Sequence, residues 1–290
     1  MKNRLLKPVA LLIAFAALFA AAACKSGGGA SSAAPESVSS VSAEESASPR
    51  SVDLAPVVDE GLPAVAYEGP DGVLENLRLL YAYNPDTVGW LSITNSGGVS
   101  FIDYPVVQSY DNNFYLRRSF FGGYASGGTV FMHYRCDPVE LSKNTVIFGH
   151  NLKDHTLFAQ LLKYGSASFY NSAPVIEFST LYEDYKFKIF AAFYTTIHFN
   201  YIRPDFARAE DFTAMIDEIT ARSVITTNVG VTAEDSIITL STCAYVDGVE
   251  GARFVVMGRL LREGESEIGC FAADNPNALG ITQKYARFGA

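Results

Sequence analysis

Cys243 and Arg253 are the residues of this chain whose types and spacing best fit nucleophilic chemistry. Cys243 directly follows the run 236–242, and Arg253 begins the next apolar run, 253–260. If the two runs pair as antiparallel strands, the cysteine and the arginine meet at one rim of a sheet. A guanidinium beside a thiol favours the thiolate, which is the nucleophilic form of cysteine.

A nucleophilic cysteine usually needs a base, and His150 is the best placed of the four histidines. It ends the run 144–151, "NTVIFGHN", so its imidazole is predicted at the exposed end of a strand, where Gly149 permits close approach of another segment. His133 lies inside an apolar run, His155 at a predicted helix start and His198 after a long strand. Residue type alone leaves the choice among the four open.

Polar neighbours of these residues are predicted to contact a substrate. Alternation along 236–242 places Ser241 on the same face as Cys243, and Thr242 on the other face. Thr242 and Ser241 precede the cysteine, and Asn151 follows His150. These three residues are the candidate substrate-binding positions. Cys243 and His150 lack companion ligands at zinc-site spacing, so no metal is expected. The predicted chemistry needs no organic cofactor either.

Each candidate also has an ordinary structural interpretation. A single cysteine at a strand end is more often a small apolar residue than a nucleophile, and Arg253 alone fits a solvated strand-end charge. Cys136 and Cys270 are expected to be structural, and the sequence does not decide whether they pair. Four cysteines in 290 residues are too few for a disulfide scaffold.

The elements that must hold these residues are mostly strands. Helical periodicity occurs in the stretch before Pro85, in 155–164 and in 209–223. Many short strands and few helices predict a closed barrel or a sandwich in a single domain. The predicted strands, which are β-branched or aromatic runs between turn residues, are 89–93, 101–107, 128–134, 144–149, 174–179, 185–197, 236–242 and 253–260.

The ends of the chain differ from this domain in composition. A basic start and an uncharged run that ends in alanines lead to Cys24, which predicts a lipoprotein-type leader (1–24) with Cys24 lipidated. The alternative is an uncleaved anchor. A Ser/Ala/Gly-rich spacer (25–68) precedes the predicted domain, 69–262, and the role of the tail, 263–290, is not assigned. Both interpretations of the leader place the domain outside the cytoplasmic membrane. The net charge of −9 argues against a nucleic-acid partner.

Several ordered motifs together resemble class B sortases, over roughly residues 70–262. The motifs are "TLSTC" (239–243), Arg253 in "RFVVMGRL" (253–260), "NTVIFGHN" (144–151), "NPDTVGWLSI" (84–93), "IDYPVVQ" (102–108), "DNNFYLRRSF" (111–120), "FGHNLKDHTLFAQLLKY" (148–164) and "YKFKIFAAF" (185–193). Tyr245 stands where some class B members carry an acid.

The resemblance implies a mainly β fold, a closed eight-stranded β-barrel with N-terminal helices and a helix between the sixth and seventh strands. It implies a cysteine transpeptidase of Gram-positive surfaces. Cys243 would be the nucleophile, His150 the general acid and base, and Arg253 the group that steadies substrate and oxyanion. The implied partners are surface proteins with a C-terminal sorting motif and a cell-wall peptide amine. Two alternatives stay open: a pilin-polymerising sortase that uses a lysine nucleophile, and an inactive sortase-like lipoprotein that only binds a peptide.

Overall fold

The computed structural model describes residues 65–281, and the predicted leader, Cys24 and most of the predicted spacer lie outside these residues. The helices, of which η1 and η2 are 3₁₀ helices, are α1 (Glu75–Tyr83), η1 (Phe114–Arg117), η2 (Phe158–Gly165), α2 (Ala167–Ser172) and α3 (Ala209–Arg222). The strands are β1 (Thr87–Thr94), β2 (Ser100–Gln108), β3 (Phe131–Met132), β4 (Asn144–Phe148), β5 (Val175–Thr180), β6 (Asp184–Thr196), β7 (Ile225–Thr227), β8 (Ile237–Cys243), β9 (Ala252–Leu260) and β10 (Ala272–Asp274). No helix between residues 65 and 281 is long and apolar enough to cross a membrane.

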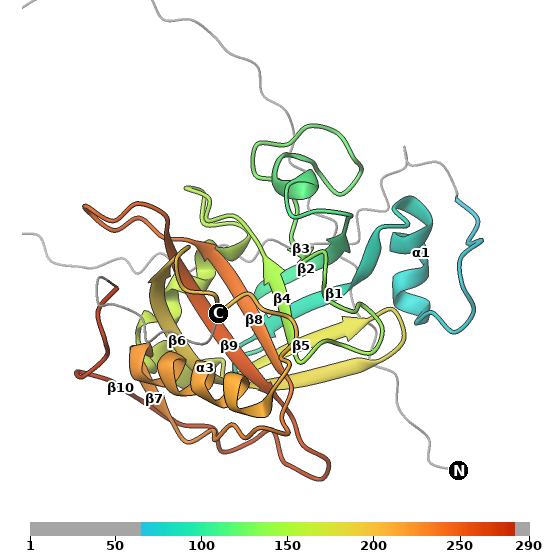
Figure 1. The fold of residues 1–290 in the computed structure, drawn as a ribbon. Coiled ribbons are helices and arrows are strands. Elements are labelled where there is room, and N and C mark those ends of the chain that lie inside the picture. The colour runs from blue at the N-terminus through green and yellow to red at the C-terminus, as the bar shows by residue number, and fades with distance from the viewer. Residues whose placement is uncertain (1–64, 282–290) are drawn as a thin grey trace, which may run out of the picture. The chain divides into compact units, whose positions relative to one another are not determined.

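Eight strands form a closed barrel in the order β1-β2-β3-β4-β8-β9-β6-β5, which confirms the predicted fold (Figure 1). Most neighbours are antiparallel, but β2 runs parallel to β3, and β4 runs parallel to β8. The sixth and seventh barrel strands are β6 and β8, and α3 lies between them in the chain as expected. Of the expected N-terminal helices, α1 is the one within residues 65–281.

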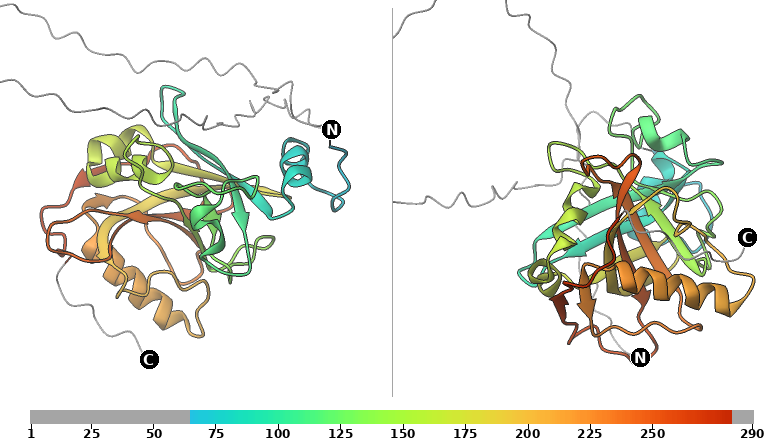
Figure 2. Two further views of the ribbon diagram at one scale, coloured as in Figure 1. Left: turned by 90° about the horizontal axis from the view of Figure 1, so that it is seen from above. Right: turned by 60° about the vertical axis from the view of Figure 1, so that its left-hand side comes forward.

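The core has two layers because the sheet is covered on both faces. Side chains such as Leu91, Ile147 and Phe254 fill the barrel interior. Outside it, α3 lies along one side of the barrel (Figure 2). Its apolar stripe, including Phe212 and Ile219, packs against β6, β8 and β9. Burial of both faces explains why β8 has apolar residues on both of its faces instead of a strict alternation of apolar and polar residues.

Two elements differ from the prediction, one in length and the other in the type of helix. The run 128–134 contributes only the two residues of β3. The segment 155–164 does not form an α-helix, because His155 and Leu157 have φ angles of 63° and 52° and helical structure begins only at Phe158, as 3₁₀ turns. A positive φ breaks the repeating helical geometry.

The tail after β9 folds back onto the barrel, and we call residues 263–281 the C-terminal strap. Within the strap, β10 pairs with β7 in a small separate sheet. Asp274 accepts a hydrogen bond from the backbone N–H of Ala167 at 2.7 Å, which ties the strap to the start of α2. The part of the tail up to residue 281 therefore packs as a part of the domain.

Candidate functional site

Cys243 and Arg253 lie directly opposite each other on the antiparallel strands β8 and β9, as predicted. Residues in such a pair project from the same face of the sheet. Along β8, Ile238 and Leu240 point into the barrel, whereas Ile237 packs in the outer layer beneath α3. By the same alternation, Cys243 and Arg253 belong to the outer face, where both are half-buried at the end of the strand.

His150 is carried toward the same rim because β4 runs parallel to β8. The last residue of β4 is aligned with Ser241, and the Gly149 N–H donates to the Ser241 carbonyl at 3.2 Å. Continuing this alignment past the strand end sets His150 level with Cys243. Gly149 permits a close approach of the Phe158 ring, which would lie 2.6 Å from a Cβ at this position.

The imidazole of His150 is oriented by a backbone carbonyl. Its Nε2 lies 3.0 Å from the carbonyl oxygen of Leu116 in η1. Because a carbonyl can only accept a hydrogen bond, Nε2 carries the proton, and Nδ1 is the basic nitrogen of the neutral ring. The carbonyl thereby performs the orienting task that a carboxylate performs in many catalytic triads. A backbone group has no signature in the sequence, so this contact was not predicted.

Ser241 and Thr242, two of the candidate substrate-binding residues, are each only 2% exposed. The Ser241 hydroxyl lies 2.8 Å from the Tyr201 hydroxyl, and Thr242 Oγ1 donates to the Gly149 carbonyl at 2.8 Å. These contacts hold β8 against its neighbours. A direct contact of either side chain with substrate stays a prediction.

Asn151, the third candidate, joins the histidine segment to the cysteine strand. Its Nδ2 donates to the backbone carbonyl of Cys243 at 3.0 Å. It also forms a short antiparallel bridge with Leu157, whose N–H donates to the Tyr104 hydroxyl at 3.0 Å. Tyr104 was not predicted, because its only sequence signal is its place in the run "IDYPVVQ" (102–108).

The other cysteines within residues 65–281 differ from Cys243 in environment, and all three are free thiols. Cys136 is buried, and burial raises the pKa of its thiol to about 11. Cys270 lies on the C-terminal strap, and burial raises its pKa as well. A raised pKa disfavours the thiolate, so neither thiol is suited to nucleophilic attack.

His133 is buried against Tyr134 and Phe148, and its ring accepts a hydrogen bond from the Arg135 N–H at 3.2 Å. Burial, with the Arg135 charge second, lowers the pKa of His133. The His133 ring therefore packs as a structural residue next to the ends of β3 and β4.

Comparison with known proteins gives one consistent result. The family model for the sortase domain matches residues 98–261. Sortase B of Listeria monocytogenes is 39% identical over 189 residues, which are 65% of this chain and 75% of the relative. The structure of the Staphylococcus aureus sortase B–substrate complex has a TM-score of 0.60 and 35% identity, covering 66% of this chain and 87% of that one. A crystal structure of sortase B complexed with triglycine has a TM-score of 0.59 and 36% identity, covering 64% and 86%.

The family match spans more than half of the chain and includes β4, β8 and β9, which carry or adjoin the three candidate residues. The closed eight-stranded barrel matches the fold of the related sortase B structures. This chain belongs to the sortase family of cysteine transpeptidases, and its relatives include sortase B enzymes.

Proposed function

We propose that this protein joins surface proteins to a cell-wall peptide through a thioester on Cys243. The observation that carries the proposal is the opposed pair of Cys243 and Arg253 on the outer rim, with the chain at His150 tied to the same strand end. In this proposal the three residues supply a nucleophile, a base and a cationic donor.

In the first half of the reaction, the Cys243 sulfur attacks the carbonyl carbon of a peptide bond in the sorting motif. Negative charge develops on the carbonyl oxygen, and Arg253 stabilises it. Arg253 Nη1 donates to the Ala252 carbonyl at 3.0 Å, and the guanidinium has further N–H groups to offer the oxyanion. The C–N bond then breaks as protonated His150 gives its proton to the leaving amine, and the acyl group remains on sulfur.

In the second half, an amine of the cell-wall peptide attacks the thioester carbonyl. Neutral His150 takes the proton from the attacking amine through Nδ1, since Nε2 is engaged by the Leu116 carbonyl. The C–S bond breaks, a new amide forms, and the thiolate of Cys243 is restored. The histidine ends protonated, ready for the next cycle.

The proposed partners are surface proteins with a C-terminal sorting motif and a cell-wall peptide, at the outer face of the membrane of a Gram-positive-type bacterium. Membrane attachment would come from the leader, with lipidated Cys24 as the proposed anchor. One related structure is a complex with a substrate and another is a complex with triglycine, which supports a peptide donor and an amine acceptor here.

The test is acyl-enzyme formation on the full chain. A library of short peptides of varied sequence is incubated with the protein, and adducts are mapped by mass spectrometry. We expect an adduct on Cys243 that amines release, none in Cys243→Ala, and adducts retained in Cys136→Ala and Cys270→Ala. An adduct on another cysteine, with Cys243→Ala still active, would overturn the assignment.

The same assay separates the alternatives. Release of the acyl group by lysine side chains but not by peptide α-amines would indicate pilin polymerisation. Binding of peptides without any adduct would indicate an inactive, peptide-binding sortase-like protein.

A further inference from the structure

Residues 150–158, which we call the histidine loop, lead from β4 into η2 and begin with the proposed base. The Phe158 N–H donates to the His150 carbonyl at 2.9 Å. One residue further into the loop, an antiparallel bridge joins Asn151 to Leu157. The backbone at His150 is therefore held by the residues that face it across the neck of the loop, Leu157 and Phe158.

The backbone of the histidine loop adopts conformations that glycine prefers. Three non-glycine residues between 65 and 281 have a positive φ, and two of them, His155 and Leu157, lie in this loop. Leu157 has a φ of 52° and a ψ of −127°, a combination that the Cβ of an L-residue makes unfavourable. Such a conformation persists only where neighbouring groups hold it in place. The loop therefore needs an anchor at Leu157.

Tyr104 supplies this anchor from a distant part of the chain. Its hydroxyl oxygen accepts a hydrogen bond from the Leu157 N–H at 3.0 Å. Tyr104 lies on β2, where it is paired with Leu91 of β1, and its ring packs against the core of the barrel. A group carried by a strand and packed against a core is held more precisely than a group on a loop. The barrel thus fixes the hydroxyl, and the hydroxyl fixes Leu157.

A second contact at His150 has a different task. The Leu116 carbonyl binds Nε2 of the imidazole, so it orients the ring. It does not hold the backbone from which the ring projects. That backbone is held through the His150 carbonyl by Phe158, the residue next to Leu157. Ring and backbone therefore have separate supports, and Tyr104 belongs to the support of the backbone.

The hydroxyl of Tyr104 is suited to support and not to proton transfer. Burial raises the pKa of Tyr104 against the smaller opposing effect of the Leu157 N–H, and the charges of Asp154 and Asp103 raise it further. The group is therefore a neutral hydroxyl near neutral pH. Its oxygen is engaged by the backbone of the histidine loop.

We propose that Tyr104 is a positioning residue, whose hydroxyl holds the histidine loop where His150 can exchange protons with the leaving and attacking amines. The inference rests on the proposed function and adds a residue to it. Loss of the hydroxyl should slow only the steps that need His150. Cleavage of a peptide bond is such a step, because the amine leaves with a proton from the histidine. Cleavage of a para-nitrophenyl ester is not, because the C–O bond breaks to release a nitrophenolate anion that needs no proton.

The test is single-turnover acylation of Cys243 in the full chain, without an acceptor amine. One acyl donor is a peptide that labels Cys243, and the other is the para-nitrophenyl ester of the acyl part of that peptide. Tyr104→Phe keeps the ring and removes the hydroxyl. We expect it to react about 10- to 100-fold more slowly than the wild type with the peptide, and nearly as fast with the ester. The peptide concentration that gives the half-maximal rate should not change.

Equal losses with both donors would assign Tyr104 to the fold or to the nucleophile, and unchanged rates with both would leave it without a role. Either result would overturn the inference. The matched control is Tyr170→Phe, which removes another buried hydroxyl, one that donates to the Ile189 carbonyl at 2.9 Å. It should react like the wild type with both donors, even where its melting temperature falls as much as that of Tyr104→Phe.

Hydrogen exchange provides a measurement that is independent of activity. In Tyr104→Phe the amides of the histidine loop should exchange faster than in the wild type, because the Leu157 N–H loses its acceptor. Tyr170→Phe should leave exchange in this loop unchanged. Equal exchange in Tyr104→Phe and the wild type would overturn the anchoring role. Absence of any adduct on Cys243 in the wild type would instead contradict the proposed function, and exchange would still decide whether Tyr104 holds the loop.

Discussion

At the scale of single residues, Arg253 has three proposed roles that can be tested separately: holding its strand, favouring the reactive form of the cysteine, and stabilising the oxyanion. Its Nη1 donates to the carbonyl of the preceding residue, Ala252, which holds the guanidinium against its own strand. It lies opposite Cys243, and in the proposed reaction its remaining N–H groups stabilise the oxyanion. The roles differ in size: an oxyanion donor contributes about 100- to 1,000-fold in turnover, whereas an exposed strand-end charge contributes about 0–1 kcal/mol of stability.

Arg253→Lys separates these roles because it keeps the charge and loses the planar fork. We expect normal folding, continued reaction with a small alkylating reagent, and loss of most transpeptidation. Melting temperature, alkylation rate against pH and turnover are measured on one preparation. Near wild-type turnover would remove Arg253 from the oxyanion role, and normal turnover in Arg253→Ala would leave it purely structural.

The hydrogen bond from Asn151 to the Cys243 carbonyl predicts that Asn151 positions the proposed nucleophile. Asn151→Ala should lower kcat by about 10- to 100-fold, the size expected for a small displacement of reacting groups. The loss of one hydrogen bond should cost about 0.5–1.5 kcal/mol of stability. Asn151→Asp should not restore turnover, since a carboxylate has no N–H to donate.

The split between kcat and KM decides the role of Asn151. A positioning residue should leave the KM for the sorting peptide nearly unchanged in Asn151→Ala. A raised KM with normal kcat would instead support the direct substrate contact predicted from the sequence.

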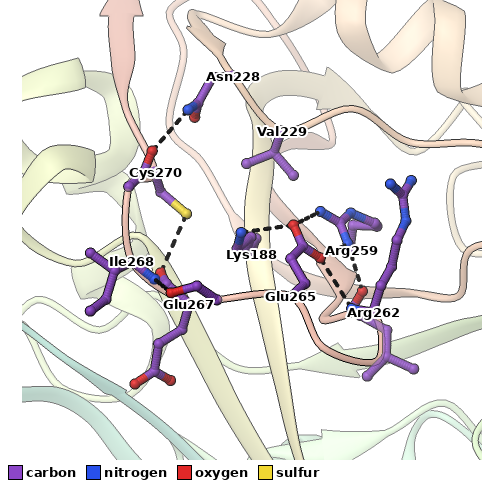
Figure 3. A network of polar contacts seen from close by, with 12 residues as sticks. Lys188, Asn228, Val229, Arg259, Arg262, Glu265, Glu267, Ile268 and Cys270 are labelled. Atoms are coloured by element: carbon purple, nitrogen blue, oxygen red, sulfur yellow. Dashed lines mark hydrogen bonds and ion pairs between the residues drawn. The ribbon is translucent and has the colours of Figure 1, made fainter.

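At the scale of elements, one carboxylate of the C-terminal strap, Glu265, meets two cations of the barrel. Figure 3 shows Glu265 between two cations from the barrel: its Oε1 lies 2.7 Å from Lys188 Nζ on β6 and 2.7 Å from Arg259 Nη2 on β9. Lys188 is 8% and Arg259 2% exposed. Uncompensated buried charges are costly, so the strap stabilises the barrel as well as covering it. The strap lies beyond residues 98–261, the range that matches the sortase family.

Glu265→Gln should therefore destabilise the domain. An exposed ion pair contributes about 0–1 kcal/mol to the free energy of unfolding, and breaking a buried one costs about 3–5 kcal/mol. Because 25% of the Glu265 side chain is exposed, the loss of unfolding free energy should fall between these two ranges. Glu263→Gln, an exposed acid two residues away, is the matched control and should change little. Equal melting temperatures for the two variants would contradict this role of the strap.

The same carboxylate predicts how stability changes with pH. The Arg259 guanidinium, and then Lys188, holds the pKa of Glu265 well below its usual range against the opposing effect of burial. A depressed folded-state pKa gives stability above the unfolded value of about 4.3, and this stability is lost as the pH falls below it. The melting temperatures of wild type and Glu265→Gln should thus converge between about pH 5 and pH 2. A constant difference across that window would argue against the ionic contribution.

At the scale of the whole molecule, a sortase that acts on surface proteins must be held near the membrane, and the proposed attachment is Cys24. Cys24 lies outside the residues that the structure describes. A lipidated cysteine would leave the barrel tethered through the spacer, 25–68. One acyl chain alone binds membranes weakly, so stable attachment needs more than one chain or an uncleaved apolar segment.

Labelling cells with a radioactive fatty acid tests this attachment. The wild-type chain should carry the label, and Cys24→Ser should lose it while purified protein keeps its activity on soluble peptides. Cys270→Ser is the control for labelling at another thiol. An unlabelled wild type that retains its first 23 residues would show that the leader is an uncleaved anchor.

The local pattern of the sequence by itself determined a mainly β fold, a barrel or a sandwich, and the ordered motifs that resemble class B sortases narrowed this to a closed eight-stranded barrel. Alternation and strand ends place Cys243 opposite Arg253 when two neighbouring runs pair, and the motif order points to His150. Only the tertiary structure decided what surrounds them. The Leu116 carbonyl and Tyr104 approach the His150 segment from distant parts of the chain. Glu265 meets Lys188 across 77 residues. Backbone carbonyls carry no residue-type signal, and long-range ion pairs follow from chain packing, so neither kind of contact can be deduced from neighbouring residues in the sequence.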